Sequence, residues 1–414
     1  VMYIKDLLVE KYGQKVVEAG GLRVITSLDE KIQKFAEDIV ASETAKLVNM
    51  NVSNAAAMVT KPPTGEILAM VGSKDYFDEE IDGNVNVCTS LRQPGSSIKP
   101  INYATGLINN HTPATLFLDR PICFNAPGQP KLYCPHNYDA RFHGPADMRS
   151  ALANSYNIPA VEMLALNGIK AMMATAKMMG ITTWNDSSSY GLSLTLGGGE
   201  VKMTEMTVAF GVFANLGKKV DLHPILKVED YQGNVYEEFN SDEVEKKLVF
   251  SSAVGYLISH ILSDNQARMP MFGARSQLYI PNHQVAVKTG TTDHPKGPRD
   301  NWTIGYTPSY LVVSWIGNND NSSMNPYLVS GVTGAAPIWN KITNFVLKNI
   351  PDESWEQPDN IVTSATCTWQ QVPKEGEEQP SEPPKECHGR EELFIKGTEK
   401  DQSVAWIEKK KIFI

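Results

Sequence analysis

The sequence predicts an α+β fold in which mostly helical segments are inserted into a sheet that is interrupted along the chain. Three observations predict it. Two β-like runs, 55–60 and 66–71, are joined by a short turn. Segments with helical periodicity, separated by Gly- and Pro-containing loops, then occupy roughly 91–216. Strand-like segments follow at 284–292 and 301–320. Since the later strands complete a sheet that the first hairpin opens, the layout is α+β.

The N-terminal segment is expected to close with an amphipathic helix. Ser27, Leu28, Asp29 and Glu30 match a capping box, with a hydroxyl at the first position and a carboxylate at the fourth. Apolar residues then recur at helical spacing over 32–40. The hairpin that follows turns at "KPPTG", where two prolines and a glycine favour a tight turn.

Composition divides the chain into three parts. A helix in "KMTEMTVAFGVFANLGKK" should end at Gly217, and the "GNND" run after the last strand is typical of a turn. After about residue 351 the composition shifts to Pro, Glu and Lys, with "VPKEGEEQPSEPPKE" as a loose loop before a short strand at "LFIKG". We expect an N-terminal segment at 1–50, a main domain at 51–350 and a small C-terminal module at 351–414.

Size and charge exclude several classes of protein. The 414 residues, 42% of them hydrophobic, can bury a large core. The net charge of −9 and the lack of clustered Lys and Arg argue against nucleic-acid binding. No apolar window is long enough to span a bilayer, and the first residues carry charges where a signal peptide is apolar. Because the chain begins with Val1, we expect a fragment whose upstream part, with a membrane anchor, is missing.

Four of the five cysteines can be paired locally. Cys123 and Cys134 bracket a Gly/Pro turn, and Cys367 and Cys387 bracket the Pro/Glu-rich loop. Two disulfides would indicate an oxidising compartment, and Cys88 would be a buried free thiol. The alternative is a zinc site made by Cys123, Cys134, His136 and His143, which the spacing disfavours.

The stretch "RQPGSSIKP" carries the first candidate chemistry. Ser96 and Lys99 lie three residues apart, so on a helix they share one face. A serine becomes a nucleophile when a base accepts its proton, and a lysine whose pKa is lowered by burial can be that base. Gly95 would let the chain bend into the helix, whose N-terminus favours developing negative charge. Alone the pattern is weak, because Ser96 is equally a helix cap.

Two further elements change this balance. Ser155 and Asn157 in "ANSYNIPAV" supply a second hydroxyl and an amide, and "VAVKTGTT" places Lys288, Thr289, Gly290 and Thr291 at a strand end. Separately they would be a loop cap and an ordinary strand end. All three elements in this order, with domain-sized gaps, match the S-x-x-K, Ser/Asn and K-T-G signature of acyl-serine enzymes.

The residue types suit one reaction. Ser96 would attack a carbonyl, Lys99 would take its proton, and Ser155 would relay a proton to the leaving amine. Asn157 can hold a substrate amide, and Lys288 with the Thr289 and Thr291 hydroxyls can bind a carboxylate.

The strand itself would help to hold the substrate. Gly290 would let an extended substrate approach the strand edge. The backbone N–H groups of Ser96 and Thr291 are the candidates for an oxyanion hole.

With these motifs quoted, the chain resembles the transpeptidase region of class A penicillin-binding proteins. "NYDARFHGPADMRSALANSYNIPAVEML", "KTGTTDHPKGPRDNWTIGYTPSYLVVSWIGNNDN" and "SGVTGAAPIW" are similar to that family's running text, as are "GGLRVITSLDEKIQ" and "ELFIKGTE" near the ends. The resemblance implies the penicilloyl-serine transferase fold, with a helical subdomain and an antiparallel sheet flanking a cleft.

The resemblance also carries expectations about substrate and place. It implies D-Ala-D-Ala stem peptides as donors, inhibition by β-lactams, an extracytoplasmic location and an upstream glycosyltransferase domain, without cofactor or metal. Residues 1–50 would be the linker ahead of the transpeptidase.

Two alternatives share the motifs. A β-lactamase needs a carboxylate that activates water, and Glu200, more simply the start of a helix after "LGGG", is the nearest acid. A β-lactam sensor or wall-binding module would bind without turnover.

Overall fold

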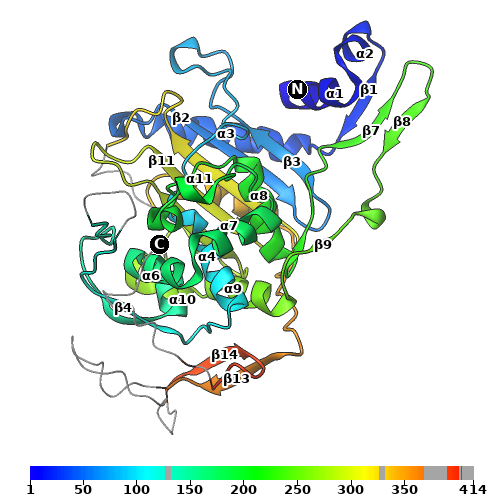
Figure 1. The fold of residues 1–414 in the computed structure, drawn as a ribbon. Helices are drawn as coiled ribbons and strands as arrows, with labels where there is room; N and C mark the ends of the chain where they lie inside the picture. The colour runs from blue at the N-terminus through cyan, green and yellow to red at the C-terminus, as the bar shows by residue number, and fades with distance from the viewer. Residues whose placement is uncertain (126–131, 326–331, 368–388, 401, 403–414) are drawn as a thin grey trace.

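The computed structural model describes residues 1–125, 132–325, 332–367, 389–400 and 402. It has the α+β fold that the sequence predicts, with a central antiparallel sheet and helices on both of its faces (Figure 1).

The helices are α1 (Met2–Tyr12), α2 (Gln14–Ala19), α3 (Glu30–Ala45), α4 (Lys99–Ile108), α5 (Met148–Ala153), α6 (Asn157–Asn167), α7 (Ile169–Met178), α8 (Met203–Ala214), α9 (Ser252–Ser263), α10 (Asn265–Phe272) and α11 (Ala336–Leu347).

The central sheet joins segments that are far apart in the chain. Its five strands run in the order β10 (Ala286–Thr291), β11 (Asp300–Tyr306), β12 (Leu311–Gly317), β2 (Asn54–Lys61) and β3 (Glu66–Val71). All neighbours are antiparallel, and β12 pairs with β2 from Leu311 opposite Thr60 to Gly317 opposite Asn54. The hairpin and the later strands therefore form one sheet, as expected, and β10 is its edge strand.

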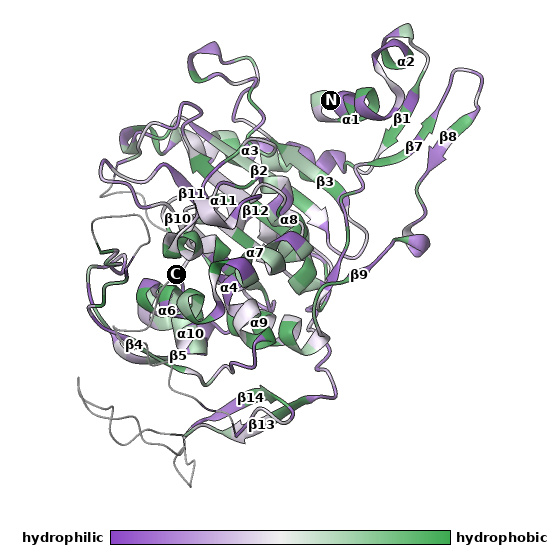
Figure 2. Ribbon diagram, in the orientation of Figure 1, coloured by the Kyte–Doolittle hydropathy of each residue, from purple (hydrophilic) through white to green (hydrophobic). Residues whose placement is uncertain are grey.

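Each face of the sheet has its own hydrophobic core. One face packs on α3 and α11, with Trp339 and Val287 among its buried residues. The other carries α8 and α9 and continues into the helical part of the chain around α4 and α6, with Trp302 and Phe210 buried there. Green, hydrophobic segments in Figure 2 follow these strands and helices. The three sequence motifs lie where β10 meets the helical part.

The capping box predicted at Ser27 is wrong. Asp29 is the N-cap of α3, and its carboxylate accepts from the backbone N–H groups of Lys31 and Ile32. The Ser27 hydroxyl instead bonds to the backbone of Ile67, with its oxygen 2.8 Å from the carbonyl and 3.0 Å from the nitrogen. The sheet thus provides Ser27 with partners that the local sequence does not show.

Smaller sheets lie outside the central one. A three-stranded sheet joins β1 (Arg23–Thr26) to β7 (Ile225–Glu229) and β8 (Val235–Glu238), and short pairs are formed by β4 (Leu116–Asp119) with β5 (Gly144–Asp147) and by β6 (Lys218–Lys219) with β9 (Lys247–Leu248). The short strand expected at "LFIKG" exists as β14 (Glu391–Ile395), which pairs with β13 (Ile361–Ala365). Every helix among the described residues is too short or too polar to cross a bilayer.

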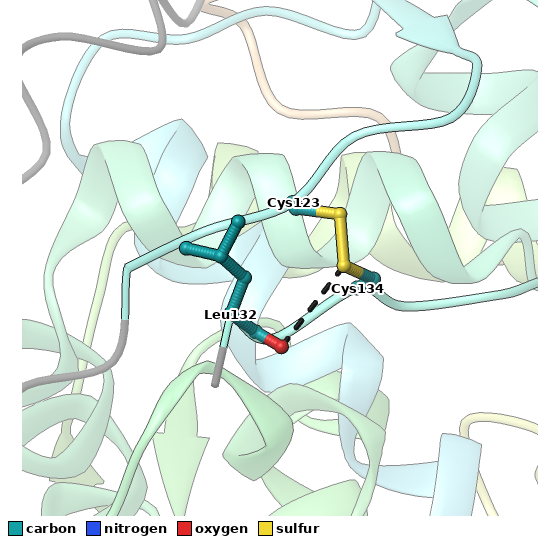
Figure 3. Close-up of a disulfide and its surroundings, with 3 residues drawn as sticks. All are labelled: Cys123, Leu132 and Cys134. Atoms are coloured by element: carbon teal, nitrogen blue, oxygen red, sulfur yellow. Dashed lines mark hydrogen bonds between the residues drawn. A yellow bond between two sulfur atoms is a disulfide. The ribbon is translucent and has the colours of Figure 1, made fainter. Parts of the chain in front are cut away.

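The cysteine pairing is settled for three residues. Cys123 and Cys134 form a disulfide, as predicted, across a loop of sequence separation 11 (Figure 3). These two sulfurs are therefore bonded to each other, which removes the alternative zinc set. Cys88 is a buried free thiol, also as predicted. Cys367 is disulfide-bonded, and Cys387, its predicted partner, lies outside the described residues.

Candidate active site

Ser96 lies on a single 3₁₀ turn, Gly95–Ile98, that leads directly into α4. Gly95 has φ 54°, the left-handed region that favours glycine. A Cβ on Gly95 would lie 2.6 Å from the carbonyl oxygen of Thr291, on β10. The bend that the sequence predicts is therefore present, and it presses the turn against the edge strand.

Two more glycines make this close packing possible. A Cβ on Gly290 would lie 2.2 Å from the carbonyl oxygen of Pro94, and one on Gly197 would lie 2.2 Å from the nitrogen of Gly95. Gly290 thus packs against the turn that carries Ser96. This contact requires a residue without a Cβ, in addition to the predicted approach of a substrate. Gly197, in the "LGGG" run, was missed as part of the site.

The segment before Ser96 is anchored on β11. The Trp302 indole donates to the carbonyl oxygen of Gln93 at 2.9 Å. The Asp300 carboxylate accepts from Trp315 Nε1 at 2.9 Å and from the backbone of Gln93. Burial raises the pKa of Asp300 to about 6. These contacts hold the backbone of the turn in place.

The neighbouring serine points away from the site. Ser97 is fully buried, and its hydroxyl donates to the carbonyl oxygen of Pro94 at 2.7 Å, inside the turn. Ser96 is half-buried. Of the two serines in "GSSIKP", Ser96 therefore has the more accessible hydroxyl, and Ser97 serves as a local cap.

Lys99 begins α4 and reaches across to the loop before α6. Its Nζ lies 2.6 Å from the carbonyl oxygen of Ser155, 3.1 Å from that of Tyr156 and 2.7 Å from Asn157 Oδ1. The side chain is completely buried. Burial, and then the charge of Lys288, hold the pKa of Lys99 well below its ordinary value.

Ser96 and Lys99 are one 3₁₀ turn apart, where side chains at i and i+3 eclipse each other. In the described residues the hydrogen bonds of Lys99 Nζ nevertheless go to residues 155–157, and none goes to Ser96 Oγ. The predicted shared face is present without a direct bond. Catalytic hydrogen bonds are commonly long in ligand-free sites.

Ser155 connects the two lysines. Its hydroxyl accepts from Lys288 Nζ at 2.7 Å and lies 3.4 Å from Lys99 Nζ. Ser155 also has φ 61°, which costs a non-glycine residue about 1–3 kcal/mol. Such strain persists where the surroundings determine the conformation, and here it brings the hydroxyl between both amines.

Lys288 is buried on β10, and its Nζ also donates to the Thr289 carbonyl oxygen at 2.9 Å. Burial, and then the charge of Arg268, lower the pKa of Lys288 to about 7. In a strand, alternate residues face opposite sides, so Lys288 and Gly290 share the face toward Ser155. Thr289 and Thr291 alternate with them, and Thr291 Oγ1 accepts from Asn301 on β11 at 2.8 Å.

Asn157 starts α6 with its amide already engaged. Its Oδ1 accepts from Lys99, and its Nδ2 donates to the carbonyl oxygen of His136 at 2.7 Å. The backbone N–H of Asn157 donates to Asn137 Oδ1 at 2.7 Å. An amide group carries two N–H hydrogens, so Nδ2 keeps one donor for another acceptor.

A polar cluster behind Asn157 was missed in the sequence. Asp119 is buried and accepts from Asn137 Nδ2, at 2.8 and 2.7 Å, and from the His143 ring at 2.6 Å. The His143 ring stacks on Tyr156 at 4.0 Å. Asn137 lies in a run quoted only for its resemblance, and His143 was considered only as a ligand of the alternative zinc site. Their role depends on Asp119, which is about 20 residues away in sequence and could not be paired with them by pattern.

The charge of Glu200, the candidate acid for hydrolysis, acts on Asp300 and Arg92. Glu200 is exposed, and its backbone carbonyl accepts from Thr183 and Trp184. The expectation that Glu200 starts a helix is also wrong, because α8 begins at Met203. Among the described residues no group of three or more His, Cys, Asp or Glu side chains is arranged to hold a metal ion.

Comparisons with known proteins agree with this geometry. The model of the penicillin binding protein transpeptidase domain matches residues 55–343. Penicillin-binding protein 1A of Aquifex aeolicus is 31% identical over 81% of this chain and 43% of its own length. This chain spans less than half of that curated relative.

Solved structures show the same fold. Penicillin-binding protein 1A from Haemophilus influenzae has a TM-score of 0.79 at 21% identity, over 96% of this chain and 75% of that one. The PonA1 protein from Mycobacterium tuberculosis, in complex with penicillin V, has a TM-score of 0.73 at 20% identity, over 86% and 94%. With three motifs converging at one strand edge and the family model matching most of the chain, this protein belongs to the class A penicillin-binding protein transpeptidase family.

Proposed function

We propose that this chain is a serine-type D-Ala-D-Ala transpeptidase that cross-links peptidoglycan through an acyl-enzyme on Ser96 and is inhibited covalently by β-lactams. The observation that carries the proposal is the convergence of Lys99 and Lys288 on the Ser155 hydroxyl, beside the turn that presents Ser96. The family match and the PonA1 complex with penicillin V support it.

In the first step Ser96 Oγ attacks the carbonyl carbon of the terminal peptide bond of the donor. Lys99, whose pKa burial and then the charge of Lys288 hold well below its ordinary value, accepts the hydroxyl proton. The oxyanion is held by the backbone N–H groups of Ser96 and Thr291. The close approach of Thr291 to the turn supports this assignment, since Thr291 N is 2.7 Å from the position that a Cβ on Gly95, the residue before Ser96, would occupy.

In the second step the tetrahedral intermediate collapses and the C–N bond breaks. Ser155 passes the proton from Lys99 to the departing amine of D-Ala, and its hydroxyl, 3.4 Å from Lys99 Nζ, is suited to this relay. An amine of a neighbouring peptidoglycan strand then attacks the acyl-Ser96 ester. Its proton returns through Ser155 and Lys99 to Ser96 Oγ, and the ester bond breaks, which releases Ser96.

Substrate recognition is proposed for the edge strand and the start of α6. The donor lies along β10 as an added strand, and Asn157 Nδ2 donates to a donor amide. Lys288, with Thr289, Gly290 and Thr291, binds the terminal carboxylate, using an N–H of its charged amine other than those donated to the Ser155 hydroxyl and the Thr289 carbonyl.

The setting of the domain is proposed with the function. We propose a linker at 1–50, the transpeptidase at 51–350 and a C-terminal module at 351–414, with a glycosyltransferase domain and a membrane anchor upstream, as the greater length of the relatives suggests. The substrate places the domain outside the cytoplasm, and the disulfide between Cys123 and Cys134 suits that compartment.

The test is the mass of the intact protein before and after incubation with a penicillin. We expect one stable adduct that persists for many minutes, maps to the peptide "QPGSSIKP" and is absent in Ser96→Ala. Ser97→Ala is the matched control and should still be labelled, because the Ser97 hydroxyl is directed into the turn. Steady consumption of penicillin with return of the unmodified mass would identify a β-lactamase. A stable adduct without turnover of a labelled stem peptide would identify a sensor.

A further inference from the structure

A buried ion pair joins the C-terminal hairpin to the helix that precedes Ser155. Arg149 lies on α5 and Glu392 on β14, 243 residues apart, and their side chains are 4% and 1% exposed. Arg149 Nε donates to Glu392 Oε2 at 2.7 Å, and a second nitrogen of the guanidinium donates to Oε1. This two-pronged geometry is the strongest form of carboxylate binding by arginine, and it fixes direction as well as distance.

Further polar groups bond to both members of the pair and hold its orientation. Arg149 NH1 lies 3.3 Å from the Asp264 carboxylate and 3.1 Å from His260 Nδ1. Burial opposes the charge of Arg149, yet the bonds to Glu392 outweigh it, so the pKa of Arg149 lies above its ordinary value. On the hairpin side, Arg390 bonds to Glu392 and also to Asp147. Removing Glu392 would leave the buried Arg149 with Asp264 as its counter-charge, and removing Arg149 would leave Glu392 with the more exposed Arg390.

Helix α5 transmits this attachment to the site because it is short and held at both ends. Asp147, already bonded to Arg390, caps α5 by accepting from the Ser150 backbone at 2.7 Å. At the other end, Asn154 Nδ2 donates to the carbonyl oxygen of Ala267, and Asn154 Oδ1 accepts from the backbone of Met271, both on α10.

Ser155 directly follows Asn154, the C-cap of α5, and has a left-handed backbone conformation. A strained residue keeps its conformation only where its neighbours are fixed. The anchors of α5 on the hairpin and on α10 meet that condition.

We infer that the β13–β14 hairpin is a positioning element of the active site, and that Glu392, through Arg149 and α5, is a positioning residue for Ser155. This inference rests on the proposed function for its kinetic consequence. Glu392 does not touch the reacting atoms. Its effect is to keep the Ser155 hydroxyl between Lys99 and Lys288, where a small displacement would slow proton transfer.

The test compares Glu392→Gln with Glu391→Gln in the full chain. Glu391 is the preceding residue on the same strand and is exposed, so its substitution removes the same charge without touching the pair. Acylation by a fluorescent penicillin gives two readouts, the labelled fraction and the rate constant of that fraction. We expect the rate constant of Glu392→Gln to fall about tenfold or more, since small misplacements cost that much, with the labelled fraction close to that of Glu391→Gln and of the wild type.

If the Arg149–Glu392 pair had a purely structural role, Glu392→Gln would change a readout other than the acylation rate constant. It would lower the labelled fraction or the melting temperature and leave the rate constant unchanged, and that result would overturn the inference. If Glu392→Gln does not fold, Arg149→Lys replaces it. Lysine keeps the charge but lacks the two-pronged geometry, so the rate constant should again fall.

Amide hydrogen exchange separates this inference from the proposed function. In Glu392→Gln, and not in Glu391→Gln, exchange should accelerate in the peptide that covers 148–157. Unchanged exchange there would refute the positioning role. A wild-type chain that penicillin does not label would refute the proposed function, and the exchange comparison would still decide whether the hairpin positions Ser155.

Discussion

Replacing Gly290 by alanine tests the close packing between the edge strand β10 and the turn that carries Ser96. Gly290 does not have a positive φ, so alanine brings no backbone strain there. Its Cβ would, however, lie 2.2 Å from the carbonyl oxygen of Pro94 and 2.9 Å from the nitrogen of Ser97. Carbon–oxygen contacts in proteins are about 3.3 Å or longer. The turn that carries Ser96 must therefore move by about 1 Å.

The size of the effect follows from that displacement. Misplacing a reacting group by about 1 Å can cost roughly 10²-fold in rate, and inserting a methyl into a packed contact costs about 1–3 kcal/mol of stability. We expect the second-order rate constant for acylation of Gly290→Ala by a fluorescent penicillin to fall about a hundredfold. The loss in rate should exceed what its change in melting temperature explains.

The matched control is Gly211→Ala. Gly211 lies within α8, and the nearest atom to its added Cβ is Pro62 Cβ at 4.0 Å, an ordinary contact. Alanine in a helix is favoured over glycine by about 0.5–1 kcal/mol. Gly211→Ala should therefore acylate at the wild-type rate. Acylation of Gly290→Ala within twofold of the wild type would refute the argument that this contact sets the position of Ser96.

Three further outcomes concern the lysine of β10 and the disulfide. Lys288→Ala should weaken acylation by a donor with a free carboxylate and leave a donor with a blocked carboxylate little changed, whereas Lys99→Ala should abolish acylation by both; equal losses with the two donors in Lys288→Ala would contradict the assignment. Since the pKa of Lys288 is lowered to about 7, its charged form is present below that pH and lost above it. The kcat/KM for the free-carboxylate donor, measured against pH, should therefore fall above about 7, a limb that Lys288→Ala should lack. Replacing Cys123 and Cys134 by serine should lower the free energy of unfolding by about 2–3 kcal/mol, from the entropy of an 11-residue loop; a denaturant titration that matches the wild type would show the loop to be held by other contacts.

Much of the fold could be predicted because its signals are local. The hairpin of β2 and β3, the strand that carries "KTG", and the existence of α8 follow from side-chain periodicity and from turn residues that act within a few positions, although α8 ends at Ala214 and not, as expected, at Gly217. The division into 1–50, 51–350 and 351–414 remains a prediction. The predicted cap of α3 was wrong because its outcome depends on a contact that is distant in sequence. Ser27 and Asp29 are both good local caps, and a strand at Ile67, distant in sequence, bonds to Ser27 and leaves the cap to Asp29.

The candidate site divides in the same way. The residue types of Ser96, Lys99 and Lys288, together with their order, were enough to predict acyl-serine chemistry, because that reaction needs a nucleophile, a base and an anion-binding cation. Their electrostatics were not predictable. The pKa values of both lysines are lowered mainly by burial, and burial is a property of packing that spacing along the chain does not contain.

The sequence by itself determined which chemical groups the three motifs contain and in which order, since each motif is a short run whose residue types can be read directly. Only the tertiary structure decided how those groups meet. It placed the Ser155 hydroxyl between two buried amines in a strained conformation, set Gly290 against the nucleophile turn, and paired Arg149 with Glu392 across 243 residues. The physical reason is range. Turn, cap and strand preferences act over a few residues, whereas desolvation, close packing and ion pairing depend on segments that only folding brings into contact.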